Sequence, residues 1–252
     1  MKLSIITVSF NSEKTIEQTI LSVISQDYTD IEYILIDGGS TDSTLEIANK
    51  YRDFIKIFIS EPDFGIYHAM NKGLSFSTGD IIGFLNSDDF YLNAHVLSQI
   101  VNTFSLKDVD SVFGDVRYVD SVDTSMIKRY WTSTPYVLGA FKKGWHPPHP
   151  AFFILRSVYL KYGGFDLDFK ISADFEWMLR LIEKNMITTA YLPSLIVNMR
   201  TGGESNKSLF NILIGNFFIF KAFHKNKIKV NIFTYPFYRF IPKIISLYKA
   251  RL

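Results

Sequence analysis

Residues 2–37 read KLSIITVSFNSEKTIEQTILSVISQDYTDIEYILID and hold two short apolar runs, 2–9 and 31–37. Short runs rich in isoleucine and leucine are expected of buried strands. The segment between them places four apolar residues on one helical face: Ile16, Ile20, Val23 and Ile24. This stretch therefore predicts a strand, a helix and a second strand.

The same alternation continues to residue 90. A capping-box pattern, Ser43-Thr44-Leu45-Glu46, indicates a helix that reaches about Tyr51. The further elements that we predict are a strand at 55–60, a helix at 66–76 and a buried strand at 80–85. Strands that alternate with helices favour an α/β fold with a mainly parallel sheet, whose ligands lie beyond the carboxyl ends of the strands.

The second half is less regular. We expect a helix at 93–104, a strand at 111–119, a loop-rich stretch at 132–150, a strand at 151–155 and a helix at 173–184. The last of these has a broad apolar stripe and should pack against the sheet.

Composition narrows the function classes. Of the 252 residues 47% are hydrophobic and none is cysteine, which excludes a disulfide scaffold, a thiolate nucleophile and a metal site built on sulfur. The N-terminus turns polar at Ser9 and Asn11, too early for a signal peptide. We therefore expect a cytoplasmic protein.

Charge is distributed unevenly along the chain. Residues 1–204 hold 18 Lys and Arg with all 25 Asp and Glu, whereas residues 205–252 hold 9 basic residues and no acid. Aromatic residues alternate with the cations of this tail, and its longest apolar run, Leu209–Phe220, is too short to span a bilayer. We predict that the tail lies on an anionic membrane surface; the alternative is a helical subdomain packed on the rest of the chain.

Polar side chains follow the predicted strands. Asp37 ends the second strand, Asp63 follows the third, and Asn86-Ser87-Asp88-Asp89 follows the fourth. Oxygen ligands of this kind suit Mg²⁺ or Mn²⁺, which usually share their shell with substrate phosphates. The alternative is that the Asp-Asp pair caps the helix at 93–104. The chain has neither a dinucleotide fingerprint nor a P-loop, so a metal would have to hold any phosphate.

Several motifs together resemble family 2 glycosyltransferases, most closely bacterial enzymes that build capsule, O-antigen and colanic-acid-type polysaccharides. The motifs span about residues 1–205 and leave the tail outside. They are Ser4–Asn11, Ile36–Asp42, Gly65–Gly73, Gly79–Asp89, Gly163–Asp166, Ile171–Glu176 and Arg200–Gly203. The resemblance implies a GT-A catalytic domain over 1–205, with a nucleotide-binding half at 1–90 and an acceptor-binding half at 91–205, followed by a basic amphipathic extension at 206–252.

The resemblance also implies a nucleoside-diphosphate sugar donor, usually a UDP-sugar, transferred with inversion to a glycan or lipid-linked acceptor at the cytoplasmic face of the membrane, with no nucleic acid partner. By position, Thr7, Val8 and Ser9 would line the nucleoside pocket and Asp37 would accept a hydrogen bond from the base. Asn86-Ser87-Asp88 stands at the family's Asp-x-Asp, so Asp88 would ligate the metal and Asn86 would reach the ribose. Met70 stands where many members carry arginine, which leaves Lys72 as the nearest cation for the phosphates.

Asp174 matches the second acid of the family's Glu-Asp motif, in which Ala173 replaces the first. An acceptor hydroxyl must lose a proton as it attacks the anomeric carbon, and Asp174 fits that role. The alternatives are that Asp174 caps the following helix or that Glu176 is the base.

Three further residues are candidates for contacts with the acceptor or the diphosphate. His149 lies at a position that many relatives also fill with histidine, Trp145 could stack on a sugar, and Arg200 beside Gly202-Gly203 could clamp phosphate. Each has a structural alternative: a buried histidine, a packed tryptophan and a surface salt bridge.

Two other functions remain open from the sequence. A sugar-1-phosphate nucleotidyltransferase also places acids at the ends of a parallel sheet, but the chain lacks its Gly-rich basic loop after the first strand. A non-catalytic membrane-associated binding module would explain Asn86 and Ala173 as decayed positions, although Asp37, Asp88 and Asp174 argue against decay.

Overall fold

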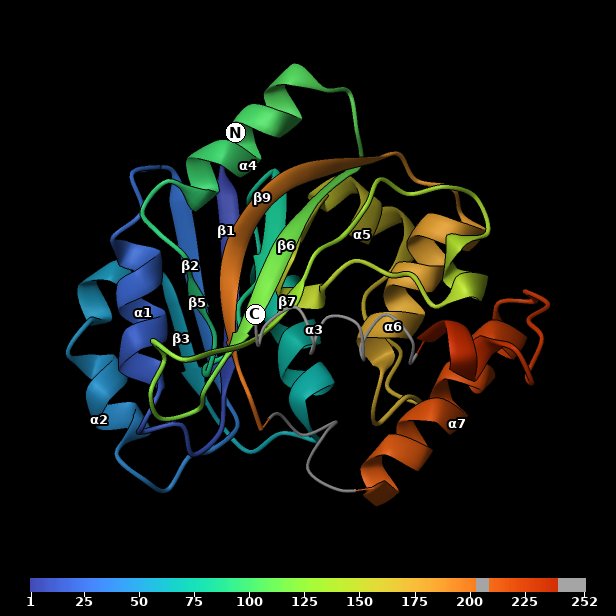
Figure 1. Cartoon of the computed structure of the whole chain (residues 1–252). Helices are drawn as coiled ribbons and strands as arrows, with labels where there is room; N and C mark the ends of the chain where they lie inside the picture. The colour runs from blue at the N-terminus through green and yellow to red at the C-terminus, as the bar shows by residue number, and fades with distance from the viewer. Residues whose placement is uncertain (203–208, 240–252) are drawn as a thin grey trace.

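The computed structural model describes residues 1–202 and 209–239 (Figure 1). Four strands of the first half form one side of a curled sheet in the order β3-β2-β1-β4, and all of their pairings are parallel. These strands are β1 (Leu3–Ser9), β2 (Ile31–Asp37), β3 (Ile57–Ser60) and β4 (Ile81–Phe84). The predicted α/β fold is confirmed.

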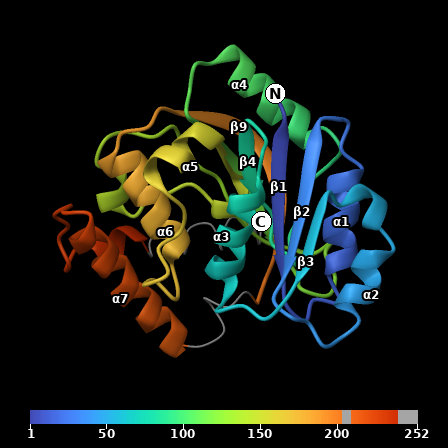
Figure 2. The same cartoon turned by 180° about the vertical axis from the view of Figure 1, so that it is seen from behind.

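Side chains alternate across the sheet because successive residues of a strand point to opposite faces. Leu3 and Ile5 of β1 pack beneath α1 (Ile16–Ile24), α2 (Thr44–Asn49) and α4 (Val96–Leu106). Ile6 and Val8 pack on the other face beneath α3 (Ile66–Phe76), α5 (Arg156–Tyr162) and α6 (Ala173–Met178). The helices therefore cover both faces of the sheet, as Figures 1 and 2 show.

The second half extends the sheet through mixed pairings. β8 (Phe152–Leu155) runs antiparallel to β4 and to β6 (Ser111–Val119), and β6 runs parallel to β9 (Thr189–Arg200). Two short strands complete the sheet: β5 (Phe90–Tyr91) pairs with β9, and β7 (Ile127–Trp131) pairs with β6.

Short 3₁₀ turns occur at η1 (Arg52–Phe54), η2 (Ala140–Lys143) and η3 (His149–Ala151). The predicted helix at 173–184 is α6 followed by a π-helical segment, η4 (Leu179–Lys184).

Two predicted helix caps are wrong. Ser43 precedes α2 but its side chain caps nothing; the Asp42 carboxylate instead accepts a hydrogen bond from the Thr44 amide at 3.0 Å. The predicted helix at 93–104 begins only at Val96, with His95 before it. The alternative that Asp88 and Asp89 cap this helix is therefore wrong.

The described part of the C-terminal tail packs on the domain. Ile219 and Phe223 of α7 (Leu209–Lys225) are buried in the same apolar cluster as α6, and Tyr235 joins them. The Lys225 ammonium pairs with Asp166, and Asn226 donates to Glu176 at 3.0 Å. This segment therefore behaves as the packed helical alternative, while the predicted boundary at residue 205 lies outside the described residues. Within 1–202 and 209–239, no helix is long and apolar enough to cross a membrane.

Candidate active site

Asp37 lies at the carboxyl end of β2 and is fully buried, with 0% of its surface exposed. Its carboxylate accepts five hydrogen bonds, at 2.5 to 3.0 Å. The donors are the hydroxyls of Ser9, Ser40 and Ser60 and the amides of Gly39 and Ser40. A carboxylate offers about four lone-pair positions, so this one is saturated. Asp37 therefore ties β1, β3 and the following loop together, and its expected contact with the nucleobase stays a prediction.

Asp63 follows β3 and is another carboxylate at this edge, expected only as one of the oxygen groups that could serve a metal. It is half-buried, and its Oδ1 accepts a hydrogen bond from the Gly65 amide at 2.7 Å. A Cβ atom on Gly38 would lie 2.6 Å from Asp63 Oδ2. The Asp63 carboxylate therefore occupies the space that a side chain at position 38 would fill.

The side chains of Thr7, Val8 and Ser9, at the end of β1, are all buried. The Thr7 hydroxyl accepts a hydrogen bond from Tyr33 at 3.2 Å. Val8 lies in the apolar core, and the Ser9 hydroxyl donates to Asp37. The expected nucleoside pocket at these residues stays a prediction.

The loop after β4 is held from beneath. The hydroxyls of Ser87 and Ser12 lie 2.8 Å apart, and the Thr19 hydroxyl contacts the carbonyls of Ser87 and Asp89 at 2.9 and 2.7 Å. Ser87 is therefore a buried support of the loop. Asp88 is half-buried, which leaves it at the surface of the site.

Asn86 and Asp89 contact each other in this loop, but the Asn86 side chain keeps one oxygen without a hydrogen-bond partner. The Asn86 amide donates to Asp89 Oδ2 at 3.2 Å, whereas its Oδ1 is buried without a hydrogen-bond partner. Burial and the neighbouring Asp88 charge raise the pKa of Asp89 well above its ordinary value. Buried acceptors are normally satisfied, so Asn86 Oδ1 remains able to accept a contact from a bound group.

A divalent cation fits this loop. Asn86 Oδ1 and the Asp88 carboxylate are the hard oxygen donors that Mg²⁺ and Mn²⁺ prefer, and Mg²⁺ in particular usually takes one or two protein carboxylates and completes its shell with phosphates and water. The part of the chain that the structure describes holds no group of three or more acidic or histidine side chains placed to bind a metal.

Arg200, at the end of β9, lies beneath the same loop. Its guanidinium donates to the Asp88 carbonyl and to the Gln18 side chain, and it lies over the Phe90 ring at 5.1 Å. Because only 8% of Arg200 is exposed, the alternative of a surface salt bridge is wrong. Arg200 positions the backbone at Asp88, and its expected contact with phosphate stays a prediction.

Lys72 is not a free cation. Its ammonium pairs with Glu61, which follows β3. A role at the diphosphate would require this pair to open.

Asp174 lies in the first turn of α6, where it is half-buried. Ser172, with a left-handed backbone at φ 71°, precedes the helix, and Asp174 caps nothing. Its Oδ1 instead accepts a hydrogen bond from the Tyr67 hydroxyl at 3.0 Å. Burial and the Asp174 charge raise the pKa of Tyr67, so the phenol stays protonated and keeps donating. The capping alternative for Asp174 is excluded.

Glu176 cannot serve as the substitute base. It is 1% exposed and pairs with Arg180 at 3.1 Å, while Asn226 donates to the same oxygen at 3.0 Å. Glu176 therefore joins α6 to the end of α7.

His149 joins the two halves of the site. Its ring lies 5.4 Å from that of Phe84, the last residue of β4, and both of its nitrogens are buried without a hydrogen-bond partner. Burial lowers the pKa of His149 although the Asp174 charge opposes the shift. The His149 ring thus contacts the end of β4, where the charge of Asp174 also acts on it.

Trp145 packs, as its structural alternative expects. Its ring contacts Phe113, Tyr136 and Phe141 at 5.4 to 5.7 Å. The indole N–H is buried without a partner, so it remains able to donate to an acceptor group.

His149 links the end of β4 to Asp174. Its ring contacts Phe84, and the charge of Asp174 acts on its pKa. The structure thus brings His149 near both the end of β4 and Asp174, which are far apart in the chain.

Comparison with known proteins decides the family. The model of glycosyl transferase family 2 matches residues 4–162. This chain is a family 2 glycosyl transferase.

Relatives of this family 2 glycosyl transferase include an uncharacterized glycosyltransferase of Mycobacterium tuberculosis. The two are 38% identical over 182 residues, which cover 70% of this chain and 67% of the relative. A PGL/p-HBAD biosynthesis glycosyltransferase of Mycobacterium bovis is 29% identical over 208 residues, which cover 81% and 78% of the two chains.

Solved structures share the fold of this glycosyl transferase. S. aureus TarS 1–349 in complex with UDP-GlcNAc has a TM-score of 0.66 at 20% identity, covering 88% of this chain and 66% of that one. The mannosyltransferase PcManGT from Pyrobaculum calidifontis, in complex with GDP-Man and Mn2+, has a TM-score of 0.68 at 18% identity, with coverages of 99% and 73%. The likeness confirms the expected GT-A architecture.

Proposed function

We propose that this glycosyl transferase moves a sugar from a nucleoside-diphosphate sugar, in particular a UDP-sugar, to a hydroxyl of a glycan or lipid-linked acceptor in bacterial surface polysaccharide synthesis. The observation that carries the proposal is a half-buried carboxylate, Asp174, held by Tyr67 and separated by His149 from the oxygen-lined loop after β4. A proton acceptor and a phosphate site then face one bound substrate.

Asp174 acts as the general base in this proposal. Tyr67 occupies Oδ1, so Oδ2 is the oxygen that takes the acceptor proton. The acceptor oxygen forms a bond to the anomeric carbon as the bond from that carbon to the diphosphate oxygen breaks. A single displacement of this kind inverts the anomeric configuration, and the nucleoside diphosphate leaves with the electron pair.

Asp88 and Asn86 Oδ1 would hold the divalent metal. When bound, Mn²⁺ or Mg²⁺ supplies positive charge that stabilises the diphosphate leaving group. Arg200 supports this role by fixing the Asp88 backbone. Support for a metal also comes from PcManGT, whose structure contains Mn2+.

Asp63 takes the role of the nucleobase contact. With Asp37 saturated, Asp63 is the half-buried carboxylate beside the Gly38 backbone, and it can accept an N–H from the base. Uracil has one such N–H, which suits one free carboxylate oxygen.

Product analysis tests the proposal. The protein is incubated with UDP-GlcNAc, UDP-glucose or UDP-galactose, Mn²⁺ and a lipid extract of bacterial membranes, and products are identified by mass spectrometry. We expect UDP together with a glycosylated acceptor. Formation of UTP and a sugar phosphate after addition of pyrophosphate would instead establish a nucleotidyltransferase, and binding of UDP without turnover of any donor would favour a binding module.

The cytoplasmic face of the membrane is the proposed place of action. The support for this is the charge of residues 205–252, which hold 9 basic residues and no acid, and the lipid-linked class of acceptor. The described part of the tail both packs on the domain and leaves basic and aromatic side chains exposed.

A further inference from the structure

Two segments far apart in the chain lie side by side at one end of the molecule. A Cβ atom on Gly144, which has φ 77°, would lie 2.9 Å from Arg239 Cα. The loop that contains η2 therefore packs directly on the backbone of the C-terminal segment, and both views show them together near α6 and α7 (Figures 1 and 2).

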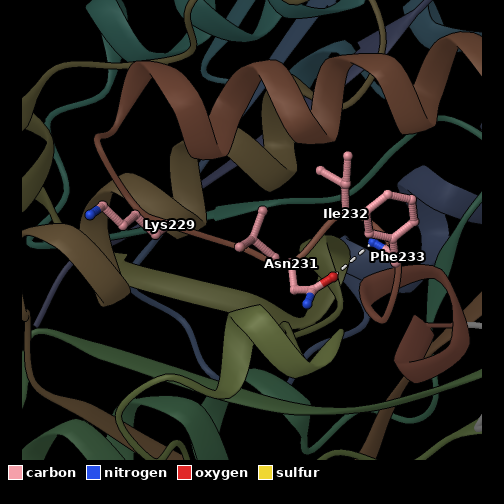
Figure 3. A pocket seen from close by; sticks show the side chains of 5 residues that line it. Lys229, Asn231, Ile232 and Phe233 are labelled. Atoms are coloured by element: carbon pink, nitrogen blue, oxygen red, sulfur yellow. Dashed lines mark hydrogen bonds between the residues drawn. The ribbon is translucent and has the colours of Figure 1, made fainter.

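Both segments expose large apolar side chains. Leu138 is 70% exposed and Phe233 is 78% exposed. The others are Val137, Ile232, Phe237 and Tyr238. We call these six residues, with the four lysines described next, the apolar-basic rim. Phe233 and Ile232 also line an open hollow of about 520 Å³ that runs from Lys229 to Phe233 (Figure 3).

The charge of the rim has one sign. Lys142, Lys143, Lys227 and Lys229 are all exposed. Residues 134–147 and 226–239 contain no aspartate or glutamate. An anionic bilayer has negative headgroups at its surface and an apolar layer below them. The exposed aromatic side chains and the lysines of the rim, with no acid among them, complement such a surface.

The rim borders the acceptor side of the site. Arg239 donates to Asn216 on α7 at 2.6 Å, and α7 passes Ser172, whose Oγ would lie 3.7 Å from a Cβ on Gly215. Ser172 immediately precedes the helix that carries Asp174. A membrane on the rim would therefore lie against the side from which an acceptor reaches the base.

We propose that the apolar-basic rim, built from 137–143 and 227–238, docks this enzyme on an anionic lipid surface. The proposal rests on the proposed function for the direction of acceptor entry, and it adds that the docking surface includes Val137, Leu138, Lys142 and Lys143, which lie outside the tail. Because α7 supplies buried core residues, point variants test the surface better than a truncated chain would.

Flotation of the full chain with liposomes tests the proposal. Vesicles of phosphatidylcholine alone are compared with vesicles containing about one third phosphatidylglycerol, with wild type and four variants. Phe233→Ser and Lys229→Gln change the rim. Phe54→Ser and Lys50→Gln are matched controls by α2, and Phe54 is 61% exposed. We expect wild type to float only with anionic vesicles, Lys229→Gln to weaken binding about fivefold, Phe233→Ser to weaken it at least as much, and both controls to float as wild type does.

A second pair of variants tests the part outside the tail. Leu138→Ser and Lys142→Gln should each weaken flotation, although neither changes residues 205–252. Equal flotation of all variants, or none by wild type, would overturn the proposal. UDP binding is measured on the same preparations. If the protein binds UDP but does not float, only the docking surface is refuted. If wild type does not bind UDP, the proposed function is refuted.

Discussion

The Tyr67 hydroxyl donates a hydrogen bond of 3.0 Å to Asp174 Oδ1, from α3 to the start of α6. This contact joins residues 1–90, the predicted nucleotide-binding half, to residues 91–205, the predicted acceptor-binding half, and it leaves Asp174 Oδ2 for the proposed role as base. Since the pKa of Tyr67 is raised, the phenol remains a donor over the working pH range.

Asp174→Asn should remove transfer while leaving donor binding nearly intact. The amide keeps the shape of the side chain but cannot take a proton, and general-base assistance is worth about 10²–10⁴ in rate. Steady-state kcat and a UDP titration measure the two effects. A kcat within about threefold of wild type, far less than the loss of a base would cause, would reject Asp174 as the base.

Tyr67→Phe should lower kcat for transfer more than it lowers UDP affinity. The variant removes the hydroxyl that holds Asp174 Oδ1 in place, so the carboxylate loses its fixed position while the loop after β4 keeps its contacts. The matched control is Tyr33→Phe, which loses a buried hydroxyl contact with Thr7 away from Asp174. A kcat of Tyr67→Phe equal to that of wild type would refute a positioning role for Tyr67.

Asp37→Asn should lower stability more than it lowers UDP affinity. The carboxylate accepts five hydrogen bonds from the ends of β1 and β3 and from the loop after β2, and an amide nitrogen in its place would face donors. We expect a loss of about 1–3 kcal/mol in the free energy of unfolding, measured with urea.

Asp63→Asn should show the opposite pattern. The variant removes an acceptor oxygen at the proposed contact with the nucleobase, so UDP affinity should fall. Within the protein it affects only the hydrogen bond from the Gly65 amide, so the urea midpoint should stay near that of wild type. A UDP affinity lowered by Asp37→Asn but not by Asp63→Asn would instead assign the contact with the nucleobase to Asp37.

His149 should make the protein less stable in mild acid. Burial lowers its folded-state pKa below the ordinary value of 6.5, so the unfolded chain binds the proton more readily. Its contribution to stability is present above pH 6.5 and is lost as the pH falls toward the folded-state pKa. Urea unfolding at pH 7.5 and pH 5.5 should show a smaller loss for His149→Phe than for wild type; an equal loss would contradict the lowered pKa.

The first half of the fold could be predicted because its strands are continuous apolar runs closed by polar turns, as at 31–37. β9 could not be predicted: Pro193 interrupts it, and its pairing with β6 changes register twice, which destroys any simple alternation. The sequence left two alternatives for the tail, a membrane-facing surface and a packed helix. Its aromatic residues are compatible with both, and only contacts such as that of Phe223 with Phe175 show that α7 packs on the domain.

Within the site, the sequence predicted where polar side chains gather better than it predicted what each of them contacts. Asp88 and Asp174 could be located from strand ends and motif positions. The saturation of Asp37 could not, because Ser9 and Ser60 reach it from two other strands. Arg200 likewise reads as a phosphate clamp until its contact with the Asp88 carbonyl is seen. The glycine at position 38 was the one sequence feature that could have indicated the place of Asp63, because the Asp63 carboxylate occupies the space that a side chain there would fill.

Calorimetric titration of UDP with Mn²⁺ and with EDTA tests the central claim, a metal-assisted diphosphate site at Asn86 and Asp88, most directly. Wild type should bind UDP more tightly with Mn²⁺, and Asp88→Ala should bind it equally weakly in both buffers. Asp53→Ala, which changes a distant exposed carboxylate on η1, should behave as wild type does. Equal affinity of the wild type with and without Mn²⁺, or an undiminished metal effect in Asp88→Ala, would contradict the account.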